Sequence, residues 1–510
     1  MVMREQPYHT PAHADTLARE MPANSERAPV QPPDDAAARR HPAFVALVAV
    51  YAIAMLAWTI LRHRHFGSGV DLGAYHSVFW NLAHRGTPYN AIERAHQWSN
   101  HLEIGLTWLA IPYRVYATPL WLLAAQTLAV AAAAFPIEAL ARRITHDRLI
   151  ASLAALAMLL TPQLVLANLA DFHAATLCVL PVAILAWGIE VDSSRAVVLS
   201  AFAAVSLREQ MGLLLVAAGV AWVIRHGMRR AFPAAVVAGF GLAFFFIAVK
   251  WAIPAFGSGQ SFRYMAQYNR LGGSADGVLS TASSGPLSFL AMAFQGDRKL
   301  FVIELASGSL PLLFLSLRSL RRAAWPLLLV APLLAVQLYS DDPAKWSIHT
   351  HYGAPLVPLF AAAAVLALAY LPAKGDTRTI AASAWLSLVM MHATQALPAL
   401  RGPGAAIDSG FSQSPRGAAL RKAIAAVPRT ASISAQPDVV PHVASRVEVH
   451  AFPDGEASDE YVLLDREGAL PRPEAARAVD EARERLRSSA DFTVLVDEAG
   501  VLLVKRASSR

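Results

Sequence analysis

The chain has 510 residues, of which 55% are hydrophobic and only 16% charged, and its mean hydropathy is +0.38. Soluble globular chains carry about a quarter charged residues, so this composition excludes an ordinary soluble enzyme and indicates a mainly α-helical, polytopic membrane protein. The formal net charge of +7 does not indicate nucleic-acid binding, because the arginines gather in short loops between apolar runs, where they orient membrane proteins. The one cysteine, Cys178, excludes an intramolecular disulfide and a cysteine-based metal site.

Residues 1–43 are rich in Pro, Ala, Asp, Glu and Arg without apolar periodicity, which predicts a disordered cytoplasmic tail. The first apolar run begins only near Phe44, so a cleavable signal sequence is not expected. Because a spanning helix needs about 20 mainly apolar residues, residues 44–400 are expected to form a membrane domain of about 11 spans. The expected spans are 44–61, 119–141, 149–168, 174–190, 196–207, 210–225, 231–253, 300–317, 324–340, 352–372 and 379–399. The fifth and sixth are short and are expected to be a broken pair that meets at a polar vertex.

The basic loops predict how the spans are oriented. The basic residues between spans are Arg142, Arg143, Arg148, Arg225, Arg229, Arg230, Arg318, Arg321, Arg322, Lys374 and Arg378. With the N-terminus inside a plasma membrane, all of them lie on the cytoplasmic side, as the positive-inside rule requires. Residues 102–117 are apolar but short, and counting them as a span would place Arg142 and Arg143 outside. They are therefore expected to form an interfacial or re-entrant helix in a long first outer loop, residues 62–118.

After about residue 400 the composition becomes that of a soluble domain. Helices are expected at 421–427 and 475–486, and strands at 431–434, 447–450, 461–465, 492–496 and 501–505. Alternating strands and helices predict a small α/β domain over residues 401–510. An odd number of spans would place this domain outside the cell.

Acidic and histidine residues fall in the breaks between apolar runs, on the side expected to be outside. They are Asp71, His101, Asp171, His173, Glu209, His349 and His351. Charged groups at membrane depth are costly and usually face a cavity or an aqueous boundary, so a one-sided collection of them predicts a functional site.

Asp71 follows the first span and precedes residues 72–84, whose apolar positions suit an amphipathic helix on the membrane surface. Asp71 could cap this helix, which is the reading that spacing alone favours, or it could accept a proton or bind a cation. Asp171-Phe172-His173 fills a turn between two spans. This turn could have a purely structural role as the cap of the next helix. Alternatively, the Asp171 carboxylate could orient the His173 imidazole or bind an ion together with it.

Arg208 and Glu209 interrupt an apolar stretch. They could be an internal ion pair that stabilises the helix break, or an acid facing a cavity beside a phosphate-binding arginine. Lys345 and His351 open the tenth span, where they could meet an anionic lipid head group, although histidine there could also be a hydrogen-bonded anchor. The pair His349 and His351 is a weak metal motif, since no third ligand follows from the sequence.

Motifs for nucleotide binding and for several hydrolases are missing from the sequence, which contains no Walker loop, HExxH, GxSxG or paired CxxC. ATP-driven transport by this chain alone is therefore not expected.

At these motifs the chain resembles a family of uncharacterised polytopic membrane proteins that is grouped with the GT-C glycosyltransferases. The matching stretches are Asp71-Leu72-Gly73 with Trp80-Asn81, Asn100-His101, Asp171-Phe172-His173, Leu207-Arg208-Glu209, His351-Tyr352, Ser434-Ala435-Gln436-Pro437 through Arg446, and Tyr461-Val462-Leu463-Leu464-Asp465. The resemblance covers roughly residues 44–470. It implies a membrane enzyme that takes a sugar from a polyprenyl-phosphate donor and transfers it to an acceptor on the outer face.

The resemblance also implies roles for single residues. Asp71 corresponds to the acidic residue early in the first outer loop, but Leu72 follows it, so the paired-acid form of the motif is missing and dependence on Mg²⁺ or Mn²⁺ stays open. The expected catalytic residues are Asp71 and Glu209; the expected substrate-binding residues are His101, Asp171, His173, Arg208, Lys345, His351 and Tyr352; the metal candidates are Asp71, Asp171 and His173. The implied partners are a lipid-linked sugar donor and membrane lipid. Two alternatives remain, a transporter or flippase of lipid-linked or anionic substrates and a non-enzymatic envelope scaffold.

Overall fold

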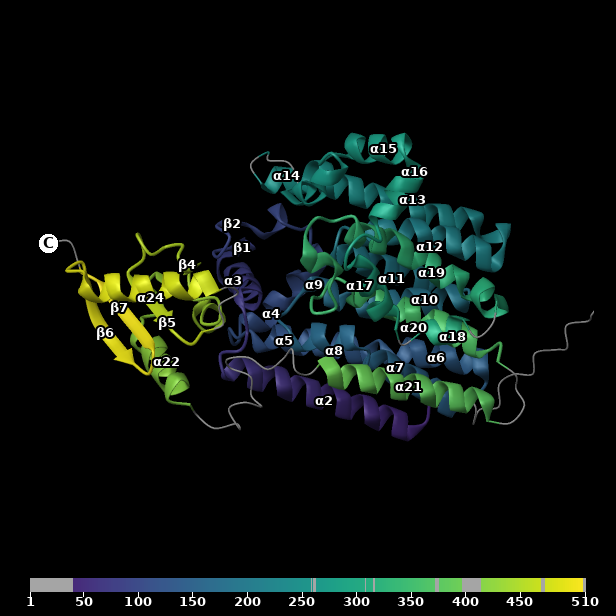
Figure 1. The fold of residues 1–510 in the computed structure, drawn as a ribbon, viewed down its shortest axis with the longest axis horizontal. Helices are drawn as coiled ribbons and strands as arrows, with labels where there is room; N and C mark the ends of the chain where they lie inside the picture. The colour runs from purple at the N-terminus through teal and green to yellow at the C-terminus, as the bar shows by residue number, and fades with distance from the viewer. Residues whose placement is uncertain are drawn as a thin grey trace, which may run out of the picture. The chain divides into compact units, whose positions relative to one another are not determined.

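A computed structural model of the chain describes residues 40–257, 259, 263–307, 309–314, 317–371, 376–396, 414–468 and 473–507 (Figure 1). Most of the expected tail, residues 1–39, and the expected domain boundary near residue 400 lie outside the described residues. Residues 42–510 form one compact unit.

The segment of residues 42–256 is almost entirely helical. It contains α2 (Pro42–Arg64), α3 (Val70–Arg85), η1 (Gln97–Ser99), η2 (Ile104–Leu109), α4 (Ala110–Tyr113), α5 (Leu120–Ala132), α6 (Ala134–Thr145), α7 (Arg148–Leu159), α8 (Pro162–Leu169), α9 (Ala174–Leu177), α10 (Val179–Glu190), α11 (Ser194–Leu207), α12 (Met211–His226), η3 (Met228–Arg230), α13 (Ala231–Ile247), the π-helical η4 (Ala248–Ala252) and α14 (Ile253–Phe256). Between α3 and η1 lies a short antiparallel hairpin of β1 (Tyr89–Asn90) and β2 (Ala95–His96). The expected amphipathic helix at 72–84 is confirmed as α3.

The helical region continues to residue 396. It contains η5 (Arg263–Leu271), α15 (Ala275–Ser284), α16 (Pro286–Met292), α17 (Arg298–Ala306), α18 (Leu310–Phe314), α19 (Leu317–Leu338), η6 (Pro343–Trp346), η7 (Ala354–Leu356), α20 (Val357–Leu368) and α21 (Thr377–Ala396). Every residue of α20 is buried, as expected of a helix that is apolar on all sides. By contrast, α2 and α13 leave most of their apolar side chains exposed, which suits helices at the lipid-facing periphery.

The expected count of about 11 spans is not confirmed. Within the described residues, three helical segments are long and apolar enough to cross a membrane: Pro42–Arg64, Leu120–Thr145 and Met228–Phe256. The pair α7 and α8, bent by 51°, could form a fourth. Six further apolar segments have only 10–17 residues, among them Ile104–Tyr113 in the first outer loop. Polar breaks and prolines divide the apolar runs of the sequence into these shorter helices.

The expected break between the fifth and sixth runs is confirmed. Helix α11 ends at Leu207, Arg208 is extended with φ −158° and ψ 123°, and α12 begins at Met211. The break therefore releases Arg208 and Glu209 from the helices and turns them into the interior, where both are buried.

The C-terminal region forms a small α/β domain around a five-stranded sheet in the order β4-β3-β5-β7-β6. Its elements are α22 (Pro415–Ala426), β3 (Ile433–Ala435), α23 (Val440–Val443), β4 (Val449–Ala451), β5 (Tyr461–Asp465), α24 (Pro473–Ser488), β6 (Phe492–Glu498) and β7 (Val501–Arg506). Strands β4, β3 and β5 are parallel, whereas β7 pairs antiparallel with both β5 and β6. The expected strands and both expected helices are confirmed.

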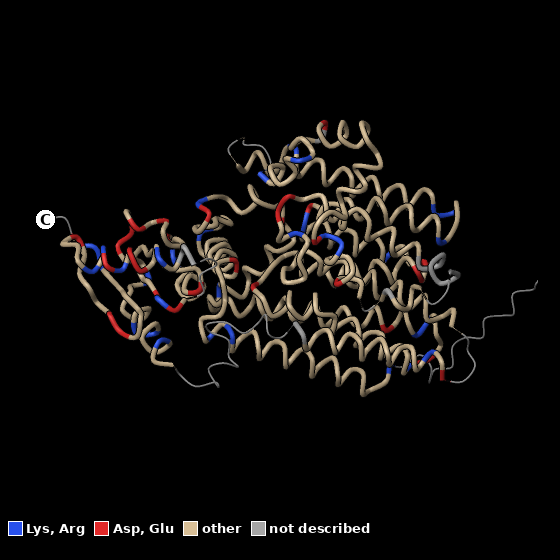
Figure 2. The backbone as a smooth tube through the Cα atoms, in the orientation of Figure 1, with Lys and Arg blue, Asp and Glu red and all other residues tan. Residues whose placement is uncertain are grey.

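Alternation along β5 divides the core of this domain. Val462 and Leu464 pack with residues of α24 on one face of the sheet, whereas Tyr461 and Leu463 pack with residues of α22 and α23 on the other. The helical region and the C-terminal domain also differ in charge. Figure 2 shows that charged residues are sparse along the long helices and dense in the C-terminal domain. The helical region thus has the charge distribution of a membrane domain.

Candidate functional site

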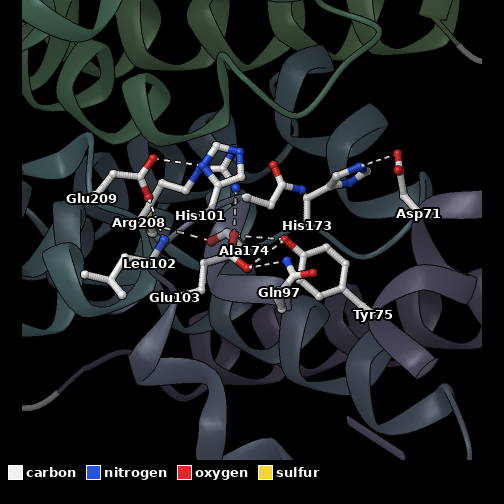
Figure 3. A network of polar contacts seen from close by, with 12 residues as sticks. Asp71, Tyr75, Gln97, His101, Leu102, Glu103, His173, Ala174, Arg208 and Glu209 are labelled. Atoms are coloured by element: carbon white, nitrogen blue, oxygen red, sulfur yellow. Dashed lines mark hydrogen bonds and ion pairs between the residues drawn. The ribbon is translucent and has the colours of Figure 1, made fainter. Parts of the chain in front are cut away.

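Asp71 lies in the first turn of α3 and forms a polar contact with His173 (Figure 3). The two atoms Asp71 Oδ2 and His173 Nε2 are 3.0 Å apart, and the Asp71 side chain is 60% exposed. The N-cap of α3 is Gly69, and no side chain caps the helix there. The interpretation of Asp71 as a helix cap is therefore wrong, and its carboxylate is available for other contacts.

Asp171 accepts a hydrogen bond from the backbone at the N-terminus of α3. The backbone N–H of Gly69 donates to both of its carboxylate oxygens at 2.9 Å, and Arg62 Nη1 lies 3.3 Å from Oδ1. A Cβ at position 69 would lie 2.7 Å from Asp171 Oδ2, so this approach requires glycine. The carboxylate of Asp171 is thus used inside the protein, to join the end of α2 and the start of α3 to the turn before α9.

The ring of His173 is fixed by hydrogen bonds on both sides. Its Nδ1 lies 2.9 Å from the carbonyl oxygen of Asp171, so Nδ1 must carry a proton and donate it, because a carbonyl only accepts. The contact between Nε2 and Asp71 therefore needs a second proton. The sequence suggested that the carboxylate of Asp171 could orient this imidazole; the backbone carbonyl does so instead.

The pKa of Asp71 shows which form its carboxyl group takes in this contact. The surrounding chain partly desolvates the exposed Asp71 carboxyl and so raises its pKa, but the hydrogen bond and the charge of His173 outweigh this effect, and the pKa lies below its ordinary value. Asp71 is therefore an ionised carboxylate beside the His173 ring. His351 stacks on the His173 ring, with centroids 3.6 Å apart and planes 16° apart. Burial first, and then the charge of His173, hold the pKa of His351 well below its ordinary value, so His351 stays neutral.

A second group of polar side chains joins the first outer loop to the break after α11 (Figure 3). Arg208 Nη1 donates to Glu103 Oε1 at 2.7 Å, and Nη2 lies 2.8 Å from His101 Nε2. An arginine can only donate, so His101 Nε2 is unprotonated and Nδ1 carries the proton. That Nδ1 lies 2.8 Å from Glu209 Oε1, and the other oxygen of Glu209 accepts the backbone N–H of Leu102 at 3.2 Å.

Glu103 receives three kinds of donor. Tyr75 OH donates to both of its oxygens, at 2.9 and 3.1 Å, and Gln97 Nε2 donates to Oε2 at 3.1 Å, in addition to Arg208. Burial nevertheless raises the pKa of Glu103 above its ordinary value. Arg208 therefore pairs with Glu103, whereas the sequence suggested an internal pair with the adjacent Glu209.

Lys345, in η6, is only 5% exposed and forms no ion pair within the described residues. Its Nζ lies 3.9 Å from the ring centroid of Tyr352 and 5.5 Å from that of Tyr264, which in turn stacks on His101. Burial lowers the pKa of Lys345 to about 8, helped by the charge of Arg208. The buried Nε of Arg208 has no acceptor in the described part of the chain. Two buried cationic groups thus have capacity for an anion.

Comparison with known proteins assigns the chain to a family. Residues 62–503 match the family described as predicted membrane protein (DUF2079). The chain belongs to the DUF2079 family. No curated protein matches this DUF2079 chain.

Two solved structures resemble the DUF2079 fold. The crystal structure of ArnT from Cupriavidus metallidurans bound to undecaprenyl phosphate has a TM-score of 0.55 and 13% sequence identity, and the match covers 92% of this chain and 98% of that one. The apo structure of the same ArnT has a TM-score of 0.53 and 12% sequence identity, and the match covers 91% of this chain and 98% of that one. At this level of sequence identity, the likeness to ArnT shows a shared fold.

The metal candidates of the DUF2079 chain do not fit a metal centre. Among the described residues, no three or more His, Cys, Asp or Glu side chains are placed to hold an ion together. Asp71 and His173 are joined by a hydrogen bond, and both oxygens of Asp171 are occupied by the N–H of Gly69. Each of these three side chains thus already has a partner within the described residues.

The structure brings most of the expected site residues into the two groups around Asp71 and Arg208, with Lys345 and Tyr352 beside them. His349 is exposed, and its backbone N–H donates to Ser347 Oγ rather than to a residue of either group. Sequence reasoning missed the roles of Tyr75, Gln97 and Glu103. An acidic residue in the apolar segment 102–117 was the signal for Glu103, because a charge there needs a buried partner.

Proposed function

We propose that this DUF2079 protein is a GT-C-type glycosyltransferase that transfers a sugar from a polyprenyl-phosphate donor to an acceptor on the outer face of the plasma membrane. The observation that carries the proposal is Lys345, a buried ammonium with no ion-pair partner in the described residues, close to a site that also contains an exposed carboxylate. A buried cation without a counter-ion is costly, and an anionic group of a substrate would offset that cost. The undecaprenyl phosphate bound to the similar ArnT structure supports a lipid-phosphate donor.

In the proposed reaction, the hydroxyl oxygen of the acceptor attacks the anomeric carbon of the sugar. The bond from that carbon to the phosphate oxygen breaks, and polyprenyl phosphate leaves with the bonding electron pair. Asp71, ionised and exposed, takes the hydroxyl proton, as a positioned general base does. Lys345 and the Nε of Arg208 stabilise the negative charge that develops on the phosphate.

The remaining residues would hold these groups in place. Glu209 binds His101 and Leu102 through its two oxygens, so in this proposal it anchors the first outer loop, and its expected catalytic role is reduced to positioning. Asp171 keeps α3 in place, and His173 orients Asp71. His351 and Tyr352 would line the donor site beside Lys345. The proposed topology keeps the N-terminus in the cytoplasm and the C-terminal domain outside, so that all these residues face the outer side.

The experiment is a donor-turnover assay with the purified protein in lipid. A panel of polyprenyl-phosphate sugars is supplied with and without divalent metal, and released polyprenyl phosphate is measured. We expect release by the wild type and a loss of about 100-fold or more in Asp71→Asn. His349→Gln, at an exposed histidine outside the polar groups, is the matched control and should behave as the wild type.

Equal release by Asp71→Asn and the wild type would remove Asp71 from the chemistry. If no donor is cleaved but polyprenyl phosphate binds in a Lys345-dependent manner, the proposal fails in favour of a transporter or flippase. The cationic groups would serve that function without a reaction. If polyprenyl phosphate is neither released nor bound, the proposal fails in favour of a non-enzymatic envelope scaffold.

A further inference from the structure

The C-terminal domain is packed against the helix that carries Asp71. Its short helix α23 contacts α3, and the core of the domain includes Phe66 and Ala91, which belong to the first outer loop. These two residues complete an apolar cluster whose other members lie between Ala419 and Leu503. The domain therefore shares its core with the loop and is not a separable module on a linker.

The closest approach is at Gly73, two residues after Asp71. A Cβ at position 73 would lie 2.5 Å from Val440 Cγ1 and 3.1 Å from the backbone nitrogen of Pro441. Real Cβ atoms essentially never approach another atom to 2.5 Å, and 3.1 Å is unusually tight, so a side chain at position 73 would force α23 and the first turn of α3 to shift. The glycine of the Asp71-Leu72-Gly73 motif thus has a packing reason that involves the C-terminal domain.

One turn later, His76 joins three parts of the protein. Its Nε2 lies 2.8 Å from Ser445 Oγ in the C-terminal domain, and its Nδ1 lies 3.0 Å from Tyr113 OH in α4. Beside it, the His63 ring at the end of α2 stacks on His442, with centroids 4.2 Å apart and planes 4° apart. These polar and ring contacts fix the rotation of α3 about its axis, because His76 is buried on the face that packs against α23.

We propose that the C-terminal domain is a positioning element of the site: α23, packed on Gly73, and Ser445, bonded to His76, fix the first turn of α3 and with it the Asp71 carboxylate opposite His173. The effect of this positioning on catalysis rests on the proposed glycosyltransferase function. Asp71 is held from two sides, by His173 of the turn before α9 and by α23. A shift of α3 at Gly73 moves Asp71 away from a partner that is 3.0 Å distant. A displacement of about 1 Å is enough to reduce catalysis strongly.

The test uses a cysteine reporter together with turnover. Cys178, the one native cysteine, is buried and can be replaced by alanine, so Asp71→Cys in that background reports the environment of position 71 by its rate of thiol labelling. Gly73→Ala, Val440→Ala and the double variant are added to the reporter and, separately, to the wild-type site. Gly239→Ala, where a Cβ meets open space, is the control for a glycine replacement in a helix. Ser445→Ala is a milder variant that removes only the hydrogen bond to His76.

We expect Gly73→Ala to change the labelling rate at position 71 several-fold and to lower kcat at an unchanged KM for the donor. Val440→Ala in the double variant removes the 2.5 Å contact but not the 3.1 Å approach to the backbone nitrogen of Pro441, so it should restore both measurements in part. Ser445→Ala should change them in the same direction by less, and Gly239→Ala should change neither. A folded Gly73→Ala protein with wild-type labelling overturns the proposal, and so does a Ser445→Ala protein with wild-type labelling if Gly73→Ala does not fold.

The labelling arm separates the two proposals. If labelling responds to Gly73→Ala and is rescued by Val440→Ala while no donor is cleaved, positioning by the C-terminal domain stands and the glycosyltransferase function fails. If donor is cleaved but kcat and labelling are unaffected by either variant, the function stands and the positioning role fails.

Discussion

Arg208 and His101 are joined by a hydrogen bond of 2.8 Å that fixes the protonation state of the histidine. Because guanidinium only donates, His101 must accept at Nε2 and therefore cannot be an imidazolium while this contact exists. Burial, followed by the charge of Arg208, lowers the pKa of His101 to about 4. The neutral His101 ring thus accepts from Arg208 at Nε2 and donates to Glu209 from Nδ1. Protonation of Nε2 would break the contact with Arg208 and disturb the geometry of the anion-binding groups.

The first prediction concerns acid. A histidine whose pKa is lower in the folded than in the unfolded protein binds fewer protons when folded between the two values, so stability is lost as the pH falls from 6.5 towards 4. We expect the wild type to lose on the order of 3 kcal/mol of stability through this group across that window, and nothing further below it. Thermal unfolding in detergent, followed from pH 7 to pH 4, measures the effect. His101→Asn should flatten this part of the profile; an unchanged slope would contradict the assignment.

The second prediction concerns Lys345 and base. Its ammonium is present below a pKa of about 8, so affinity for an anion should fall by about tenfold per pH unit above that value. The ligand-free protein should respond in the opposite direction and become more stable as the pH rises from 8, because the folded protein then releases the costly buried proton first. Binding of polyprenyl phosphate at pH 7 and pH 9.5, with Lys345→Arg as the always-charged control, distinguishes this from general alkaline damage. If Lys345→Arg and the wild type lose affinity together, Lys345 is not the responsible group.

The third prediction separates the two aspartates. Asp171→Asn removes the ion pair with Arg62 and one acceptor for the Gly69 N–H, at a cost of about 1–3 kcal/mol. Asp71→Asn leaves these contacts intact, so its unfolding temperature should stay near that of the wild type. Differential scanning fluorimetry and the turnover assay on both variants check the contrast. The assignment is wrong if Asp171→Asn is stable but has no turnover while Asp71→Asn is unstable. In that case Asp171 would be the catalytic residue and Asp71 the structural one.

Much of the architecture follows from local sequence pattern. The strand at Tyr461–Asp465 and the amphipathic helix after Val70 could be located because alternation and 3.6-residue periodicity report directly on burial. The number of spans could not, because α20 is as apolar as a span but has only 12 residues, and hydropathy alone does not reveal where a chain breaks. The candidate residues were recognisable as charges in apolar surroundings.

The partners of those residues were not recognisable from the sequence. Arg208 is adjacent to Glu209 but bonds to Glu103, 105 positions earlier. Asp71 resembled a helix cap because aspartate is favoured at such positions, yet the cap falls on Gly69 and the carboxylate turns to His173. Such pairings depend on how separate helices pack, which no local pattern encodes.

The last prediction tests whether the Arg208 group is held by its charges or by its hydrogen bonds. Glu103→Gln keeps the shape of the side chain but removes the counter-charge of a buried arginine, which should cost about 3–5 kcal/mol. Tyr75→Phe removes one neutral donor to the same carboxylate and should cost about 1 kcal/mol, because Arg208 and Gln97 still donate to it. Because the freed Arg208 would attract anions more strongly, Glu103→Gln should also bind polyprenyl phosphate more tightly than Tyr75→Phe. Unfolding temperatures and lipid-phosphate affinities of the two variants decide the matter: equal stability losses would mean that Glu103 acts as a neutral acceptor, and equal affinities would mean that Arg208 does not contact the phosphate.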